Sequence, residues 1–263
     1  MAGCPEFLNF ESGVYRSKPA KVSAFTRAFP SLVFYPAMFS IVYGASRKAK
    51  QGKFDDLEWC KRGMAILRLF ERIGTQIEIS GQDILKQLDR PVVFVGNHMS
   101  TLETFVLAPI IVPYRRISFV IKESLIRFPV FKHIMMALNP IVVGRTNPRD
   151  DLKIVLEQGA RKISDDVSVV VFPQRTRTTE FNRDDFNSIG IKLARKANVP
   201  VVPIAIKTDA WGIGKWIKDF GKIDPKKTVR LAFGEPMEIR HRGTEEHQMV
   251  IDFIEQHLEM WKE

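Results

Sequence analysis

A histidine and a glutamate five residues apart, His98 and Glu103, follow a short apolar run at residues 91–96. An imidazole at the exit of a strand is well placed to act as a base. A turn between the two residues can fold the carboxylate onto the ring, which fixes the tautomer and stabilises the imidazolium that forms. A histidine that caps a helix beside a solvated first-turn acid has the same spacing. The pair alone therefore leaves both interpretations open.

A second group of residues suits the binding of an anion. Two arginines and three threonines follow the apolar run 167–172, and a further arginine follows the run 140–143. Guanidinium groups grip phosphate through two parallel hydrogen bonds. Surface arginines are common, but basic groups at the exits of several strands predict an anion site. The predicted substrate-binding residues are Lys122, Arg145, Gln174, Arg175, Thr176 and Arg177.

The elements that position these residues begin at about residue 75, where short apolar runs alternate with stretches of helical period. Near-continuous apolar strands predict a sheet covered on both faces, and strand–helix alternation predicts parallel crossovers. We therefore expect an α/β fold with a mostly parallel central sheet of about seven strands, flanked by helices. In such a sheet, chemistry collects where strands end. The predicted strands are 75–80, 91–96, 117–121, 140–143, 167–172, 200–206 and 229–233, and the predicted helices are 101–111, 129–138, 148–163, 186–197 and 245–261.

The N-terminal region, residues 1–74, has a different character and is predicted to be a separate membrane-associating helical pair before the α/β domain at 75–263. Residues 28–45 carry no charge, and Pro30 and Pro36 interrupt them. A helix that lies in or dips into one leaflet fits this stretch better than a full span. A buried core helix is the alternative. Residues 54–73 form an amphipathic helix that pairs with it.

The distribution of charge also points to an anionic partner. The net charge is +10, and residues 1–74 hold 12 Lys and Arg against 6 Asp and Glu. A membrane leaflet and a nucleic acid are the candidates. The basic excess lies beside an apolar helix and no groove-reading motif is present, which favours the membrane and predicts no nucleic-acid partner. Aromatic residues and lysines over 211–227 suit a membrane interface, a flap over the site or an ordinary surface loop.

Two cysteines without paired or metal-binding spacing indicate reduced thiols in a cytoplasmic setting. We accordingly expect a peripheral or monotopic protein on the cytoplasmic face of a membrane.

Four short blocks connect these features to a known family. In chain order they read NHMSTLE, VVGR, FPQRTRT and VPVVPIAI. They resemble the four blocks of the phospholipid/glycerol acyltransferase family, whose familiar bacterial members are the 1-acylglycerol-3-phosphate acyltransferases. The resemblance runs from about residue 75 to about residue 235. The N-terminal helices also resemble that family's membrane-binding pair.

The resemblance implies a reaction and a role for several residues. His98 matches the catalytic histidine, which deprotonates the acceptor hydroxyl so that it attacks an acyl thioester, and Glu103 stands where the family has aspartate. Arg145 and Arg177 match arginines implicated in holding the acceptor's phosphate, and Pro203 matches the proline of the fourth block. The implied protein is an O-acyltransferase of phospholipid biosynthesis. It takes acyl-CoA or acyl-ACP (acyl carrier protein) as co-substrate and a lysophospholipid-like acceptor, with no metal and no other cofactor.

The sequence departs from the family pattern at three positions. The first block is His-x4-Glu, and the third is Phe-Pro-Gln-Arg-Thr-Arg, with Gln174 in place of glutamate and Arg175 in place of glycine. Both changes make the third block more positive, so a different or more anionic head group than glycerophosphate is plausible. A thioester or ester hydrolase that uses water, and a non-catalytic lipid-binding relative, remain the alternatives.

Overall fold

The computed structural model describes residues 4–127, 129–174 and 176–262. The strands are β1 (Val14–Arg16), β2 (Ile77–Ser80), β3 (Val93–Gly96), β4 (Ile117–Lys122), β5 (Ile141–Val143), β6 (Ser168–Val171), β7 (Val201–Lys207) and β8 (Val229–Phe233). The helices are α1 (Ala24–Ala28), α2 (Pro30–Lys50), α3 (Asp56–Arg72), α4 (Gln82–Gln87), α5 (Glu103–Ile111), α6 (Ser124–Arg127), α7 (Pro129–Leu138), α8 (Pro148–Ser164), α9 (Ile189–Ala197) and α10 (Thr244–Met260). A 3₁₀ turn lies at Arg183–Asp185.

The predicted α/β fold with a mostly parallel sheet is confirmed. Eight strands are ordered β1-β2-β8-β7-β3-β6-β4-β5. The five strands from β7 to β5 in this order are mutually parallel, whereas β8 runs antiparallel to β7 and β1 antiparallel to β2. The strand missed by the sequence is β1, whose three residues are too short to show a period. The carboxyl ends of five neighbouring strands thus meet at one edge.

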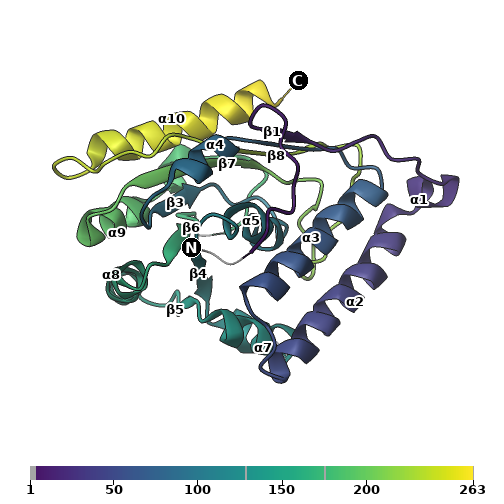
Figure 1. Ribbon diagram of the computed structural model, residues 1–263, viewed down its shortest axis with the longest axis horizontal. Helices are drawn as coiled ribbons and strands as arrows, with labels where there is room; N and C mark the ends of the chain where they lie inside the picture. The colour runs from purple at the N-terminus through teal and green to yellow at the C-terminus, as the bar shows by residue number, and fades with distance from the viewer. Residues whose placement is uncertain (1–3, 128, 175, 263) are drawn as a thin grey trace.

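Helices cover both faces of this sheet (Figure 1), and the side chains of the central strands β3, β6 and β7 are divided between two hydrophobic cores. In β3, Phe94 joins the core under α3 and α5, while Val93 and Val95 join the core under α8, α9 and α10. This double burial explains why the strands read as continuous apolar runs rather than as alternating ones.

Two predicted helices begin later than expected because side chains cap the preceding turn. The hydroxyl of Ser100 accepts from the Leu102 amide at 3.0 Å, and the helix expected over 101–111 begins at Glu103. The side chain of Asn187 accepts from the Ile189 amide at 3.0 Å, where the helix expected over 186–197 begins. Such local hydrogen bonds offer the backbone an alternative to the helix.

The N-terminal helices α2 and α3 pack against each other, as predicted, and α2 also packs against α7. The expected interruption of the first helix is wrong. Pro30 occupies the first turn of α2, where its missing N–H needs no partner, and the helix continues through Pro36. Among the described residues, the structure contains no helix that is long and apolar enough to cross a membrane.

The division at residue 74 stays a prediction, and the N-terminal region packs directly on the rest of the chain. Strand β1 pairs with β2, and α3 approaches α5 at Gly63. A Cβ at Gly63 would lie 2.3 Å from the Phe105 carbonyl oxygen. Pro109 has no N–H to give to that carbonyl, so the glycine lets α3 cover it closely. This contact supports α5, the helix that begins at Glu103.

Candidate active site

The predicted site residues come from loops at one edge of the sheet. Residues 97–103 follow β3, Arg145 follows β5 and residues 172–178 follow β6. The turn after β3 is attached to β7 by Asn97, whose buried amide donates to the Ile206 carbonyl at 2.7 Å and accepts from the Ile206 N–H at 2.9 Å. This pair of bonds extends the ladder between the two strands by one position and fixes where the next residue, His98, projects.

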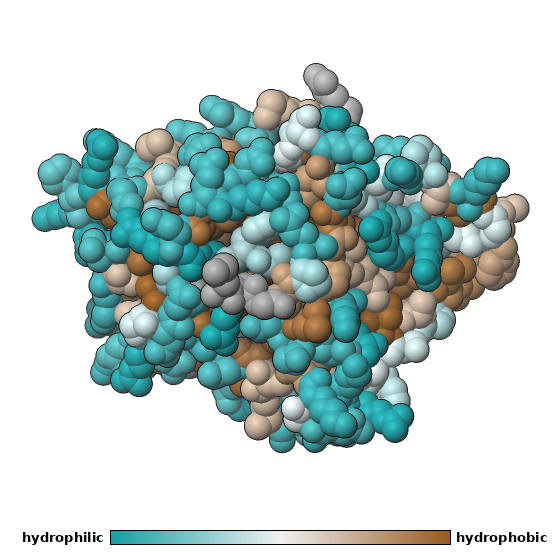
Figure 2. Space-filling view, viewed as in Figure 1, coloured by the Kyte–Doolittle hydropathy of each residue, from teal (hydrophilic) through white to brown (hydrophobic). Residues whose placement is uncertain are grey.

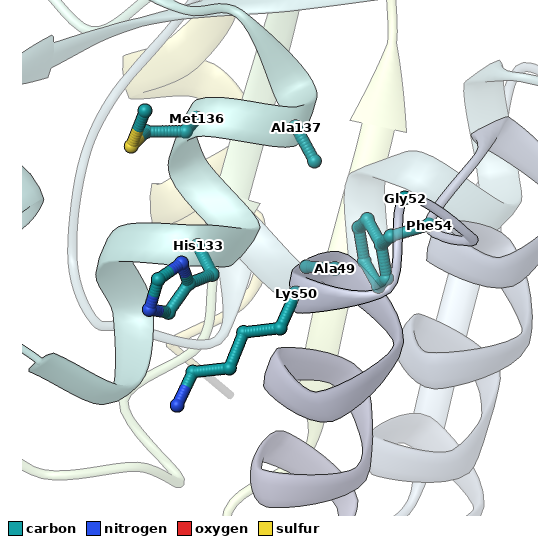
Figure 3. Close-up of a pocket in the computed structure, with 7 residues that line it drawn as sticks. All are labelled: Ala49, Lys50, Gly52, Phe54, His133, Met136 and Ala137. Atoms are coloured by element: carbon teal, nitrogen blue, oxygen red, sulfur yellow. The ribbon is translucent and has the colours of Figure 1, made fainter.

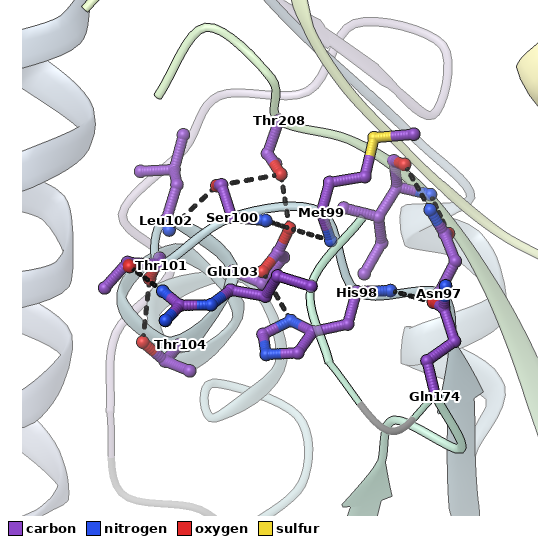
Figure 4. A network of polar contacts seen from close by, with 12 residues as sticks. Asn97, His98, Met99, Ser100, Thr101, Leu102, Glu103, Thr104, Gln174 and Thr208 are labelled. Atoms are coloured by element: carbon purple, nitrogen blue, oxygen red, sulfur yellow. Dashed lines mark hydrogen bonds and ion pairs between the residues drawn. The ribbon is translucent and has the colours of Figure 1, made fainter. Parts of the chain in front are cut away.

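The structure brings His98 and Glu103 together (Figure 4). The Nδ1 atom of His98 lies 2.9 Å from Oε2 of Glu103. The glutamate side chain is 0% exposed and the histidine side chain 18%. A carboxylate accepts hydrogen bonds, so Nδ1 carries the proton and Nε2 keeps its lone pair. This contact is the one that the base interpretation of the pair requires, and in the helix-cap interpretation Glu103 would be solvated rather than buried.

The second oxygen of Glu103 accepts three further hydrogen bonds. The backbone amides of Met99 and Ser100 donate to Oε1 at 3.0 Å and 2.7 Å, and the hydroxyl of Thr208 donates to the same atom. The Ser100 hydroxyl in turn donates to Thr208 at 3.0 Å (Figure 4). The extra methylene of glutamate is thus accommodated by a tight turn and by a hydroxyl at the end of β7.

The opposite side of the imidazole is held by the loop after β6. The ring of Phe172 stacks on the His98 ring, with centroids 4.5 Å apart and planes 7° from parallel. Gln174 accepts from the His98 amide at 2.6 Å and donates to Thr178, whose own amide donates to the His98 carbonyl. The amide of Gln174 thus joins the two loops, and its predicted contact with substrate stays a prediction.

A cavity of about 700 Å³ opens in front of the histidine. Its deeper walls are apolar and include Phe119 of β4, Val42 of α2 and Ile134 of α7. Four predicted site residues line it together with His98: Lys122, Arg145, Thr176 and Arg177. Gln174 is not among its lining residues, and Arg175 lies outside the described residues.

The two arginines make the mouth of the cavity electropositive. Burial lowers the pKa of the Arg145 guanidinium, with Asp151 opposing the shift and the nearby charge of Arg177 adding to it. Arg145 adopts a left-handed backbone with φ 58°, and its amide donates to Asp151 at 3.3 Å. Two partly desolvated cations held close together favour the binding of an anion. Arg177 also contacts Asp219 of the β7–β8 connection, with Nη1 and Oδ1 2.7 Å apart.

A smaller pocket of about 440 Å³ lies on the outside of this cavity, between the end of α2 and α7 (Figure 3). Phe54 lines both pockets and is largely buried. Its ring therefore stands between the apolar end of the cavity and the surface.

Comparison with known proteins agrees with this geometry. The model of the family described as Acyltransferase matches residues 76–207, which include β2 to β7 and every predicted site residue. The chain belongs to the acyltransferase family. The matched region ends at Lys207, one residue before Thr208.

Several relatives of this acyltransferase have curated names. A 1-acyl-sn-glycerol-3-phosphate acyltransferase of Pseudomonas aeruginosa is 28% identical over 204 residues, covering 77% of this chain and 73% of that protein. One from Chlamydomonas reinhardtii is 30% identical over 131 residues, covering 50% of this chain and 38% of that protein. The crystal structure of the 1-acyl-sn-glycerophosphate acyltransferase from Thermotoga maritima covers 90% of this chain and 97% of its own, with a TM-score of 0.66 and 23% identity. That structure confirms the fold.

Three residues of this candidate site were not predicted from the sequence. Thr208 could have been found, because it follows β7 at the same sheet edge as the other site loops. Phe172 was noted only as the first residue of the third block. Its stacking on His98 depends on the course of the loop after β6, which the sequence does not show. Asp219 belongs to the long connection between β7 and β8. No periodic pattern in the sequence indicates where that connection lies in the fold.

We predict that Thr208→Val lowers kcat by about tenfold, because a hydrogen bond to a charged group contributes about 1.5–3 kcal/mol and its loss lets the carboxylate move away from His98. Thr208→Ser keeps the hydroxyl and is expected to retain most of the rate. Steady-state acyl transfer with both variants measures this. Equal kcat in the valine variant and the wild type would remove Thr208 from the positioning of Glu103.

Proposed function

We propose that this acyltransferase moves a fatty acyl chain from an acyl thioester to the hydroxyl of a lysophospholipid-like acceptor, with His98 as general base oriented by Glu103. One observation carries the proposal: the base, two arginines and an apolar enclosure all belong to a single cavity. A base supports deprotonation, the arginines support an anionic head group, and the apolar walls support an acyl chain.

The chemistry follows from the orientation of the imidazole. Nε2 of His98 takes the proton of the acceptor hydroxyl as the oxygen attacks the thioester carbonyl. The new ester C–O bond forms and the C–S bond breaks. The proton then passes from the imidazolium to the departing thiolate. Glu103 stabilises the imidazolium between these two transfers. A thiolate is a good leaving group, so neither a protein nucleophile nor a further cofactor is needed.

The basic residues that line the cavity support the proposed lysophospholipid-like acceptor. Arg145 and Arg177 present guanidinium groups beside His98, and Lys122 adds a cation at the end of β4. Phosphate is an anion that such groups bind well, through paired hydrogen bonds. The curated relatives are named for 1-acyl-sn-glycerol 3-phosphate, which has one free hydroxyl, one acyl chain and a phosphate. CoA and acyl carrier protein both supply a thioester of the required kind.

The membrane surface is proposed as the place of reaction, on its cytoplasmic face. Figure 2 shows apolar residues gathered at the end of the molecule where α1 and the start of α2 lie. The β7–β8 connection adds Trp216, which is 97% exposed, and the same connection carries Lys215 and Lys222. Aromatic and basic side chains together suit the lipid head-group region. The exposed apolar residues of this surface are Phe25, Phe29, Leu32, Phe39, Tyr43, Trp216 and Ile217.

We predict that His98→Ala abolishes formation of the acylated lipid without unfolding the protein. The assay uses one labelled acyl-CoA or acyl-ACP and a panel of lysolipids, and it separates acylated lipid from free fatty acid. His241→Asn, a change on an exposed loop, serves as a control that should keep wild-type turnover. Undiminished transfer by His98→Ala contradicts the proposed mechanism, and free fatty acid as the main wild-type product supports a hydrolase instead.

Leu32→Glu is expected to lower the partition coefficient onto vesicles containing anionic lipid by about tenfold or more, because the apolar contribution of a buried leucine is about 1.5–3 kcal/mol. Met249→Glu introduces the same charge at an exposed apolar residue of α10 and should bind as the wild type does. Co-sedimentation measures both. Equal losses in the two variants would mean that net charge, rather than this surface, controls binding.

A further inference from the structure

The connection between β7 and β8 brings a carboxylate into the proposed acceptor site. Asp219 lines the same cavity as His98, and its Oδ1 lies 2.7 Å from Nη1 of Arg177. The hydroxyl of Thr101 donates to the same oxygen at 3.0 Å. The Arg177 side chain is 16% exposed and that of Asp219 37%. The ion pair therefore lies at the boundary between the cavity and solvent.

The carboxylate takes up hydrogen-bonding capacity that a phosphate would use. A guanidinium binds phosphate or carboxylate through the same fork of N–H donors. In this structure one of those donors, Nη1 of Arg177, already contacts Asp219 and Thr101. The negative charge of Asp219 also offsets one of the two cations, Arg145 and Arg177, that face the cavity.

The backbone around Asp219 is held on both sides. Its carbonyl accepts from the indole N–H of the buried Trp211 at 3.0 Å. The Phe220 ring packs on Tyr35 and Phe39 of α2, with centroids 5.7 Å and 5.4 Å apart. These contacts keep the main chain in place, so the carboxylate can leave Arg177 by rotation of its own side chain toward solvent.

We propose that Asp219 is a specificity-determining residue that competes with the acceptor's anionic group for Arg177. This inference rests on the acceptor site proposed above. A phosphomonoester carries close to two negative charges and three acceptor oxygens, so it displaces the carboxylate and leaves it turned to solvent. A neutral lysolipid does not take Arg177, so it leaves the ion pair in place. Asp219 thereby weakens binding of acceptors whose anion must displace it, and it leaves acceptors without an anion unaffected.

The test uses Asp219→Asn in the whole chain, since asparagine keeps the shape and removes the charge. With 1-acyl-sn-glycerol 3-phosphate as acceptor, KM is expected to fall about three- to tenfold while kcat stays unchanged. Asp224→Asn removes a charge from the same connection at a residue that does not line the cavity, and it should leave KM unchanged. A higher KM or a lower kcat in Asp219→Asn would mean that Asp219 positions Arg177, and an unchanged KM would mean no role; either result overturns the proposal.

Calorimetric titration with inorganic phosphate separates this inference from the proposed function. Asp219→Asn should bind phosphate about three- to tenfold more tightly than the wild type, and Arg177→Gln should bind it more weakly. The comparison needs no turnover, so it decides the role of Asp219 even if the lysolipid proves not to be a substrate. Equal phosphate affinity in Asp219→Asn and the wild type contradicts the competition.

Discussion

The site depends on the hydrogen bonds that the fully buried carboxylate of Glu103 accepts. Burying such a group without partners costs several kcal/mol, and here the turn at residues 98–100 and the end of β7 both supply donors. Because these donors belong to different elements, satisfying the carboxylate also fixes their relative positions. The imidazole of His98, held by Glu103 and stacked on Phe172, has little freedom to turn away from the cavity.

The parallel sheet explains why unrelated parts of the chain converge on this carboxylate. Five neighbouring strands end at one edge, and their exits carry the base, the arginines and the hydroxyl of Thr208. The helices α2 and α7 then add an apolar enclosure beside the polar edge. The contact of Phe220 with α2 ties the proposed membrane surface to the connection that carries Asp219. The proposed acceptor site and the proposed membrane surface are thus parts of one packed assembly.

Much of this was predictable from the sequence because strands buried on both faces leave long apolar runs, and polar residues just after them mark the sheet edge. The His98–Glu103 contact followed from spacing together with the four blocks. The eighth strand, β1, is too short to show a pattern, and its pairing is set by the register with β2. Pro36 was expected to interrupt the first helix, but α2 continues through it. The sequence left residues 211–227 open between a membrane interface, a flap and a surface loop. Their Trp211 is buried beside Phe34 and Phe70, a contact between distant segments that no local pattern shows.

If the carboxylate of Glu103 is what makes His98 a base, Glu103→Gln should remove most of the activity. Glutamine keeps the size of the side chain but lets the amide face Nδ1, which favours the wrong tautomer. Single-turnover transfer of a labelled acyl chain, with folding checked by circular dichroism, measures the effect on the chemical step. We predict a rate about 10²- to 10⁴-fold below the wild type, with unchanged affinity for the acceptor. A rate within a few-fold of the wild type would mean that His98 does not depend on Glu103.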